Sequence, residues 1–89
     1  MNKPTKEFLN HLKNERNFSL ATIDSYRRDI EKFFTFLNKE GYLMDQVNQM
    51  IIRNFLTDEL QNGVTKRSCK RRLSALRHFY RYLIDAHYV

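Results

Sequence analysis

The sequence has little of the residues that interrupt helices or cross-link chains. Its 89 residues include two glycines, one proline and one cysteine, and no tryptophan. So few glycines and prolines favour long, uninterrupted helices. Cys69 has no second cysteine with which to form an internal disulfide or a cysteine-based zinc site. This cysteine usage fits a reducing cytoplasm.

Long apolar runs are also missing. No segment approaches the roughly 20 consecutive apolar residues that span a bilayer. The polar start, MNKPTKEFLNHLKNERN, lacks the apolar stretch of a signal peptide. We therefore expect no membrane partner. His11, His78 and His87 lie in different segments without the spacing of metal ligands, so we expect no metal and no other cofactor.

The residues that are present suit one modest core. Hydrophobic residues make up 42% of the chain, with seven phenylalanines and five tyrosines among them. A chain of this length buries roughly 60–65% of its unfolded surface, which is enough for a small core but not for a deep enzyme cleft. We therefore expect a single domain over residues 1–89 and no catalytic residues.

Charge is distributed very unevenly along the chain. The net charge is +6, yet residues 1–63 carry nine basic and nine acidic side chains, which cancel. Residues 64–89 carry seven basic side chains and one acid, so the whole excess lies there. An excess confined to one segment indicates an anionic partner more strongly than a high isoelectric point does.

Hydrophobic periodicity predicts an all-α fold with four helices and no sheet. The first helix is expected roughly over Thr5–Glu15. The second follows Ser19 as N-cap and stops at Gly41, a residue suited to a left-handed helix end. The third begins near Asn48 and ends at Asn62–Gly63, and the fourth follows Thr65 and reaches about Asp85. Short connections predict a compact bundle. The expected buried stripes are Phe8, Leu9 and Leu12; Ile23, Tyr26, Ile30, Phe33, Phe34 and Leu37; Ile52, Phe55, Leu56 and Leu60, with Ile51 at the margin; and Cys69, Leu73, Leu76, Tyr80 and Leu83, flanked by Phe79 and Ile84.

The fourth predicted helix, TKRSCKRRLSALRHFYRYLID, has two distinct faces. Its apolar residues fall within an arc of about 80°, and its cations follow the other side. Like charges at i,i+4 spacing destabilise a helix by a few tenths of a kcal/mol per pair. A series of such pairs without acidic residues between them therefore indicates that an anionic partner compensates the repulsion. The cationic stripe comprises Lys66, Lys70, Ser74, Arg77 and Arg81, with Arg67, Arg71 and His78 beyond it.

Duplex DNA is the anion that best fits such a stripe, because a straight helix fits the major groove. Three other interpretations compete: a merely solvated surface, a helical protein-interaction module, and a helix-turn-helix regulator. A protein-interaction module would use patches of mixed sign, and a helix-turn-helix regulator needs a shorter recognition helix. Arg72 is an exception, since it falls within the apolar arc. It could snorkel, pair with an acid of another helix, or face a second partner.

Two stretches resemble the tyrosine recombinase family of phage integrases and Xer-type recombinases. NERNFSLATIDSYRRDIEKFFTFL is similar to the family's second-helix signature, and SCKRRLSALRHFYRYLI is similar to its fourth-helix signature. The match is to one part only, the N-terminal core-binding domain, which is a SAM-like bundle of four or five helices. The residues that carry it are Ser19, Thr22, Tyr26, Asp29, Ile30, Phe33, Phe36 and Leu37, followed by Arg71, Leu73 to Arg77, Phe79, Tyr80, Tyr82 and Leu83.

The resemblance implies that the domain positions a recombinase on duplex DNA. Thr22, Tyr26 and Arg27 would then contact phosphates, although the apolar-arc position of Tyr26 also fits a core residue with its hydroxyl directed outward. The fourth helix would present its cationic side to the DNA. The residues of that side are Lys66, Arg67, Lys70, Arg71, Ser74 and Arg77.

The catalytic signature of the family is not matched. HFYR fits its His-x-x-Arg box only by accident, inside the fourth-helix signature. We therefore expect a fragment that does not cleave DNA, whose partners are a catalytic domain of the same parent chain and other recombinase protomers on DNA. The resemblance also implies a bacterial or phage-encoded protein of the cytoplasm, associated with the nucleoid. Changing Lys70, Arg71 and Arg77 together to Glu is expected to abolish DNA affinity and leave the helices intact.

Overall fold

The computed structural model describes residues 2–89, and its regular structure is helical throughout. The elements are α1 (Lys3–Asn14), α2 (Leu20–Glu40), the short 3-10 turn η1 (Met44–Gln46), α3 (Gln49–Gln61) and α4 (Lys66–Asp85). No strand occurs within this described range. The all-α prediction is therefore confirmed. None of the helices between residues 2 and 89 is long and apolar enough to cross a membrane.

Side-chain caps set the starts of the helices, as the sequence predicted for three of them. Ser19, Asn48 and Thr65 each accept a hydrogen bond from a backbone N–H of the following first turn. Gly41 ends α2 in the left-handed region with φ of 79°. The start of α1 was predicted too late, because Asn2 is the actual N-cap and accepts from the Thr5 amide.

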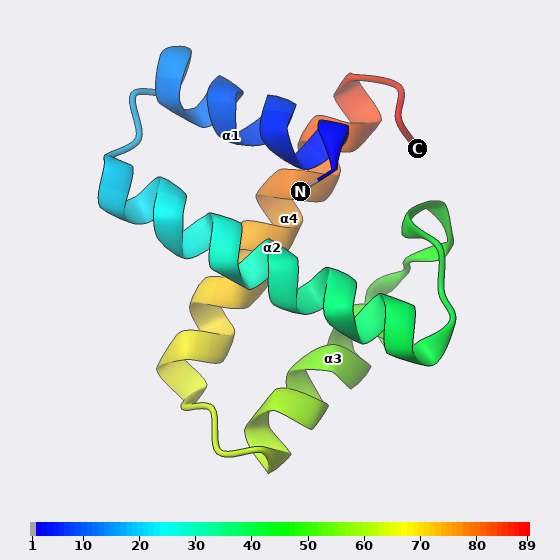
Figure 1. Cartoon of the computed structure of the whole chain (residues 1–89). Coiled ribbons are helices and arrows are strands. Elements are labelled where there is room, and N and C mark those ends of the chain that lie inside the picture. Colours follow the sequence, from blue (N-terminus) through cyan, green and yellow to red (C-terminus); the bar gives the residue numbers. More distant parts are fainter. Residues whose placement is uncertain (1) are drawn as a thin grey trace.

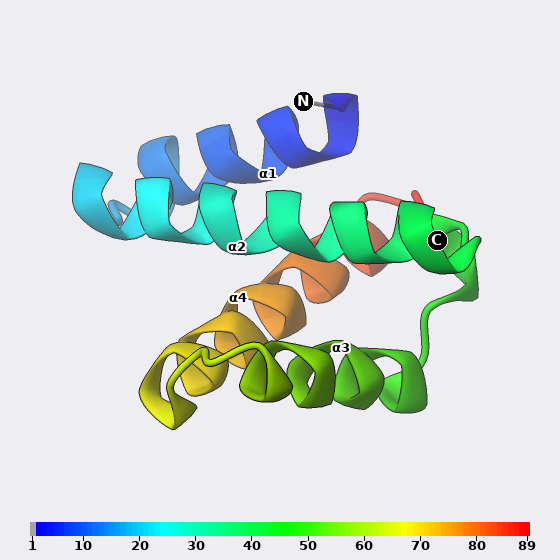
Figure 2. The same cartoon turned by 60° about the horizontal axis from the view of Figure 1, so that its bottom comes forward.

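The four helices form two layers that share α4. α1 and α2 run antiparallel beside each other, with α3 and the first part of α4 below them (Figures 1 and 2). α4 crosses the molecule obliquely and contacts α1, α2 and α3. Its buried side therefore meets three helices, which leaves one long side of α4 facing outward.

The core consists of two clusters that both draw on α2 and α4. In the first, residues of α1 pack on Ile30 and Phe79; in the second, residues of α3 pack on Phe33 and Leu76. The partly buried Phe34 and Tyr80 touch both clusters. Most of the predicted core residues are buried or partly buried in this way, and Phe36 and Ala75 join them.

The predicted buried stripe of α3 is correct for Phe55 and for the partly buried Ile52 and Leu56, but it extends too far toward Leu60. Ile51 and Phe55 are buried, whereas Leu60 is exposed. At 100° per residue, Leu60 lies about 160° around the helix from the midpoint of Ile51 and Phe55. The stripe of α4 is likewise rotated, by about 55° toward Ala75, so that Ile84 is exposed. Periodicity shows that a helix has an apolar side, but the neighbouring helices decide which part of that side is covered.

Candidate nucleic-acid interface

The outward side of α4 carries a row of exposed cations. Thr65 caps the helix, and no acid occurs in α4 before Asp85, so no carboxylate of the same helix lies one turn from the first cations. We call this set the α4 basic face: Lys66, Arg67, Lys70, Arg77 and Arg81, with the exposed Ser74 among them. Within residues 2–89, no carboxylate oxygen lies within 4.0 Å of the side-chain nitrogens of these five cations.

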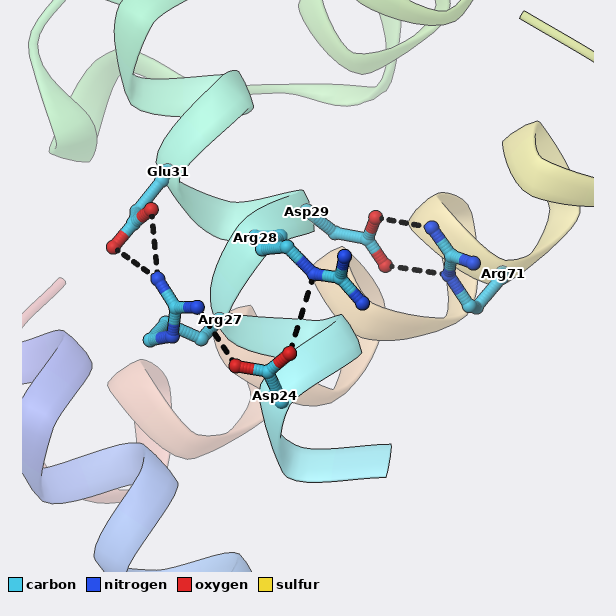
Figure 3. Close-up of polar contacts among 6 residues, drawn as sticks. All are labelled: Asp24, Arg27, Arg28, Asp29, Glu31 and Arg71. Carbon is cyan, nitrogen blue, oxygen red and sulfur yellow. Dashed lines mark hydrogen bonds and ion pairs between the residues drawn. The ribbon is translucent and has the colours of Figure 1, made fainter. Parts of the chain in front are cut away.

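Arg71 differs from the α4 basic face because α2 supplies it with an acid. Its Nε and Nη2 donate to the two carboxylate oxygens of Asp29 at 3.0 and 2.8 Å. Asp29 is only 1% exposed, whereas the Arg71 side chain remains 44% exposed. These hydrogen bonds raise the pKa of the Arg71 guanidinium above its ordinary value. Figure 3 shows the pair facing each other across the contact between α2 and α4.

Arg72 is buried and pairs with acids of two other helices. Its Nε lies 3.5 Å from Asp29, and its Nη1 contacts Glu59 of α3. Neither nitrogen makes a well-aligned hydrogen bond within the described chain, so these contacts are mainly Coulombic. Of the three interpretations that the sequence left open for Arg72, the structure selects pairing with other helices. Asp29 thereby joins α2 to two consecutive arginines of α4.

Tyr26 is a core residue with its hydroxyl near the surface. It is 7% exposed, and its hydroxyl oxygen lies 3.3 Å from Nδ1 of His78. Burial raises the pKa of the Tyr26 hydroxyl, and the nearby charge of Asp29 adds to this. Phe18 packs edge-on against both rings. Little of Tyr26 is left to contact a ligand, which favours the core interpretation.

The two other α2 residues of the predicted site lie in different surroundings. Thr22 is exposed, and its Oγ1 accepts a hydrogen bond from the Ser19 hydroxyl. Arg27 is held within α2 by Asp24 at 2.7 Å and Glu31 at 3.1 Å. Arg27 and Glu31 lie on the opposite side of α2 from Asp29 (Figure 3). The structure thus gathers the predicted α4 residues other than Arg71 on one face, but it does not bring Arg27 to them.

The pairing of Arg71 with Asp29 is the feature that sequence reasoning missed, whereas pairing with an acid of another helix was one of the three interpretations left open for Arg72. A signal for both pairs existed, because Asp29 falls about 40° from Phe33, next to the apolar arc of α2, while Arg72 falls within that of α4. Opposite charges on two buried stripes predict an ion pair, since an unpaired buried charge is very costly. Glu59 gave a similar signal, because at 100° per residue it falls between Phe55 and Ile52 on the stripe predicted for α3.

Comparison with known proteins agrees with the resemblance seen in the sequence. Residues 5–87 match the family described as "Phage integrase, N-terminal SAM-like domain". A tyrosine recombinase XerC of Thermodesulfovibrio yellowstonii is 34% identical over 92% of the chain. A XerC of Bacillus pumilus is 36% identical over 86% of the chain, and a XerD of Bradyrhizobium diazoefficiens is 37% identical over 93%.

The match covers only a part of each relative. The chain spans about a quarter of their length, with 26% of each of these three proteins aligned. No solved structure matches significantly. Because the family match extends over nearly the whole chain and over all four helices, this protein belongs to the phage integrase N-terminal SAM-like domain family.

Proposed function

We propose that this domain binds duplex DNA non-covalently through the α4 basic face and positions a tyrosine recombinase on its core site. One observation carries the proposal: five cations share one exposed side of one helix, and no described carboxylate neutralises them. Repulsion along such a row is relieved when phosphates bind. The exposed Ser74 lies within the row and allows close approach of a phosphate.

The shape of α4 favours duplex DNA over other polyanions. Its 20 residues correspond to a rod about 30 Å long, and an α-helix fits the major groove. Packing of α4 on three helices leaves its basic side free along its length. The modules that read single-stranded RNA use an exposed sheet with aromatic residues or a GXXG loop, and the sequence contains no GXXG.

The names of the relatives support a role within a larger enzyme. They are tyrosine recombinases, and the chain matches about a quarter of each. The domain therefore serves as a binding module in a bacterial or phage recombinase or integrase. A catalytic domain of the same parent chain performs strand cleavage and rejoining, and further protomers assemble beside it on the DNA.

Fluorescence anisotropy with a labelled duplex tests this proposal at several salt concentrations. If about four cations contact phosphates, log K falls with log[salt] at a slope near −3.6. The triple variant Lys66→Glu, Lys70→Glu, Arg77→Glu is expected to lose binding. It replaces the set chosen from the sequence, because a glutamate at position 71 would face the buried Asp29 and disturb the fold.

The matched control changes three exposed lysines elsewhere, Lys13, Lys32 and Lys39, to Glu. Both triple variants lower the net charge from +6 by six, so a general charge effect would weaken both equally. Selective loss in the α4 variant supports the proposal. Equal loss in the two variants, or retained affinity in the α4 variant with normal far-UV circular dichroism, would refute it.

A further inference from the structure

Arg71 is held in a way that the α4 basic face is not. One edge of its guanidinium is hydrogen-bonded to the buried carboxylate of Asp29, yet nearly half of the Arg71 side chain is exposed to solvent. The pairing cancels most of its charge toward a distant phosphate. Arg71 therefore adds little to the general attraction of DNA. A different contribution follows from the geometry of the guanidinium.

The guanidinium presents two usable edges, and Asp29 occupies only one of them. Nε and Nη2 face the carboxylate, while Nη1 points away from it (Figure 3). No acceptor within residues 2–89 is hydrogen-bonded to Nη1. The second edge of the guanidinium consists of Nη1 and the remaining N–H of Nη2, and it can donate two parallel hydrogen bonds. Guanine offers the matching pair of acceptors, O6 and N7, in the major groove.

Asp29 also fixes the direction of that free edge. An arginine side chain gives up much rotamer freedom when it is immobilised, and the two hydrogen bonds to Asp29 have already restricted it before any ligand arrives. Asp29 is itself immobile, because it is buried and also approached by Arg72. A guanidinium held in one orientation suits the recognition of a base, whereas a flexible cation is sufficient to bind a phosphate.

From this arrangement we infer that Arg71 reads a guanine in the major groove and that Asp29 is the positioning residue that aims it. The inference rests on the proposed function and deepens it, because it divides the cations of α4 into two classes. The α4 basic face contacts phosphates and supplies affinity. Arg71 supplies preference for one base.

Selection from duplexes with a randomised central segment, followed by sequencing of the bound fraction, tests the inference. Wild-type protein is expected to enrich guanine at one position by about 10-fold over the other bases. Arg71→Lys keeps the charge and can still pair with Asp29. Because lysine lacks the planar guanidinium that donates two parallel hydrogen bonds, the guanine preference should disappear. Arg77→Lys is the matched control and should keep the preference, because Arg77 is assigned to a phosphate.

Asp29→Asn separates positioning from a purely structural role. It keeps the size of the side chain but removes the charge that holds Arg71. The guanine preference should fall severalfold, while affinity for a duplex of unrelated sequence stays equal or rises. A purely structural role would lower both affinities together. Far-UV circular dichroism checks the fold, and if this variant does not fold, the comparison of Arg71→Lys with Arg77→Lys still decides.

The possible failures are distinguishable. If wild-type protein binds no duplex at low salt, the proposed function itself fails. If it binds but enriches guanine at no position, or if Arg71→Lys enriches guanine as strongly as wild type, DNA binding stands and the assignment of Arg71 is overturned.

Discussion

Arg71 on α4 donates two hydrogen bonds to the carboxylate of Asp29 on α2, across 42 positions of sequence. Arg72 approaches the same carboxylate from inside the bundle and reaches Glu59 on α3. Three helices are thus joined by two arginines and two acids at the edge of the core. The same contacts decide which cations of α4 are neutralised within the protein and which remain for a ligand.

The network predicts unequal costs for its members. Asp29→Ala removes the acid that both arginines share and should lower the free energy of unfolding by about 3 kcal/mol. Arg72→Met should cost clearly less, because an apolar side chain of similar length replaces a guanidinium whose Nε and Nη1 lack well-aligned hydrogen bonds. Urea unfolding measures both variants, and an equal or larger loss for Arg72→Met would contradict this account.

Arg27 and Arg77 should differ in their effect on DNA affinity. Asp24 and Glu31 hold Arg27, whereas Arg77 has no described acid within 4.0 Å. Arg77→Gln is therefore expected to weaken binding severalfold and to reduce the salt slope by about one. Arg27→Gln removes the same formal charge and should change affinity less. Anisotropy titrations of the two variants at equal salt measure the difference, and a larger effect of Arg27→Gln would place the DNA surface elsewhere.

Tyr80 should make stability fall at high pH. Burial raises the pKa of its hydroxyl above the ordinary value, and the hydroxyl donates to the Met44 carbonyl at 2.9 Å. The unfolded tyrosine ionises near pH 10. The stabilisation is therefore fully present below that pH and is lost as pH rises from there toward the folded pKa.

The comparison with Tyr80→Phe isolates this effect. At about pH 8, the variant should be less stable by about 1 kcal/mol, because it lacks the hydrogen bond. At about pH 11, only the wild-type unfolded state gains from ionisation of this residue, so the difference should shrink. Urea unfolding at both pH values checks the sign. A difference that grows with pH would show that Tyr80 is not the responsible group.

Leu76 should be among the costly positions of the core. It is fully buried in the cluster with Phe33 and Phe55, so Leu76→Ala should lower the free energy of unfolding by about 2–5 kcal/mol. Leu20 is 70% exposed at the start of α2, and Leu20→Ala should be nearly neutral. Thermal unfolding compares the two. Similar losses would mean that Leu20 is covered in solution or that Leu76 is poorly packed.

Much of the fold could be predicted from local sequence. Ser19, Asn48, Thr65 and Gly41 mark helix ends because caps and left-handed stops depend on residues within a few positions. The apolar sides of α2 and α4 follow from periodicity for the same reason. Leu60 was wrongly expected to be buried, and Ile51, expected only at the margin of the stripe, is buried, because the exact direction of a buried side depends on where the neighbouring helices lie.

The candidate site could be predicted from the sequence only in part: its charge distribution could, but the partners in its ion pairs could not. The sequence by itself determined that the charge excess lies on α4 and that most of the cations share one side, since a regular helix fixes side-chain directions. Only the tertiary structure decided that Asp29 neutralises Arg71 and that Glu59 reaches Arg72. Ion pairing and burial join residues that are far apart in sequence, and helix packing, which no local pattern specifies, brings them together.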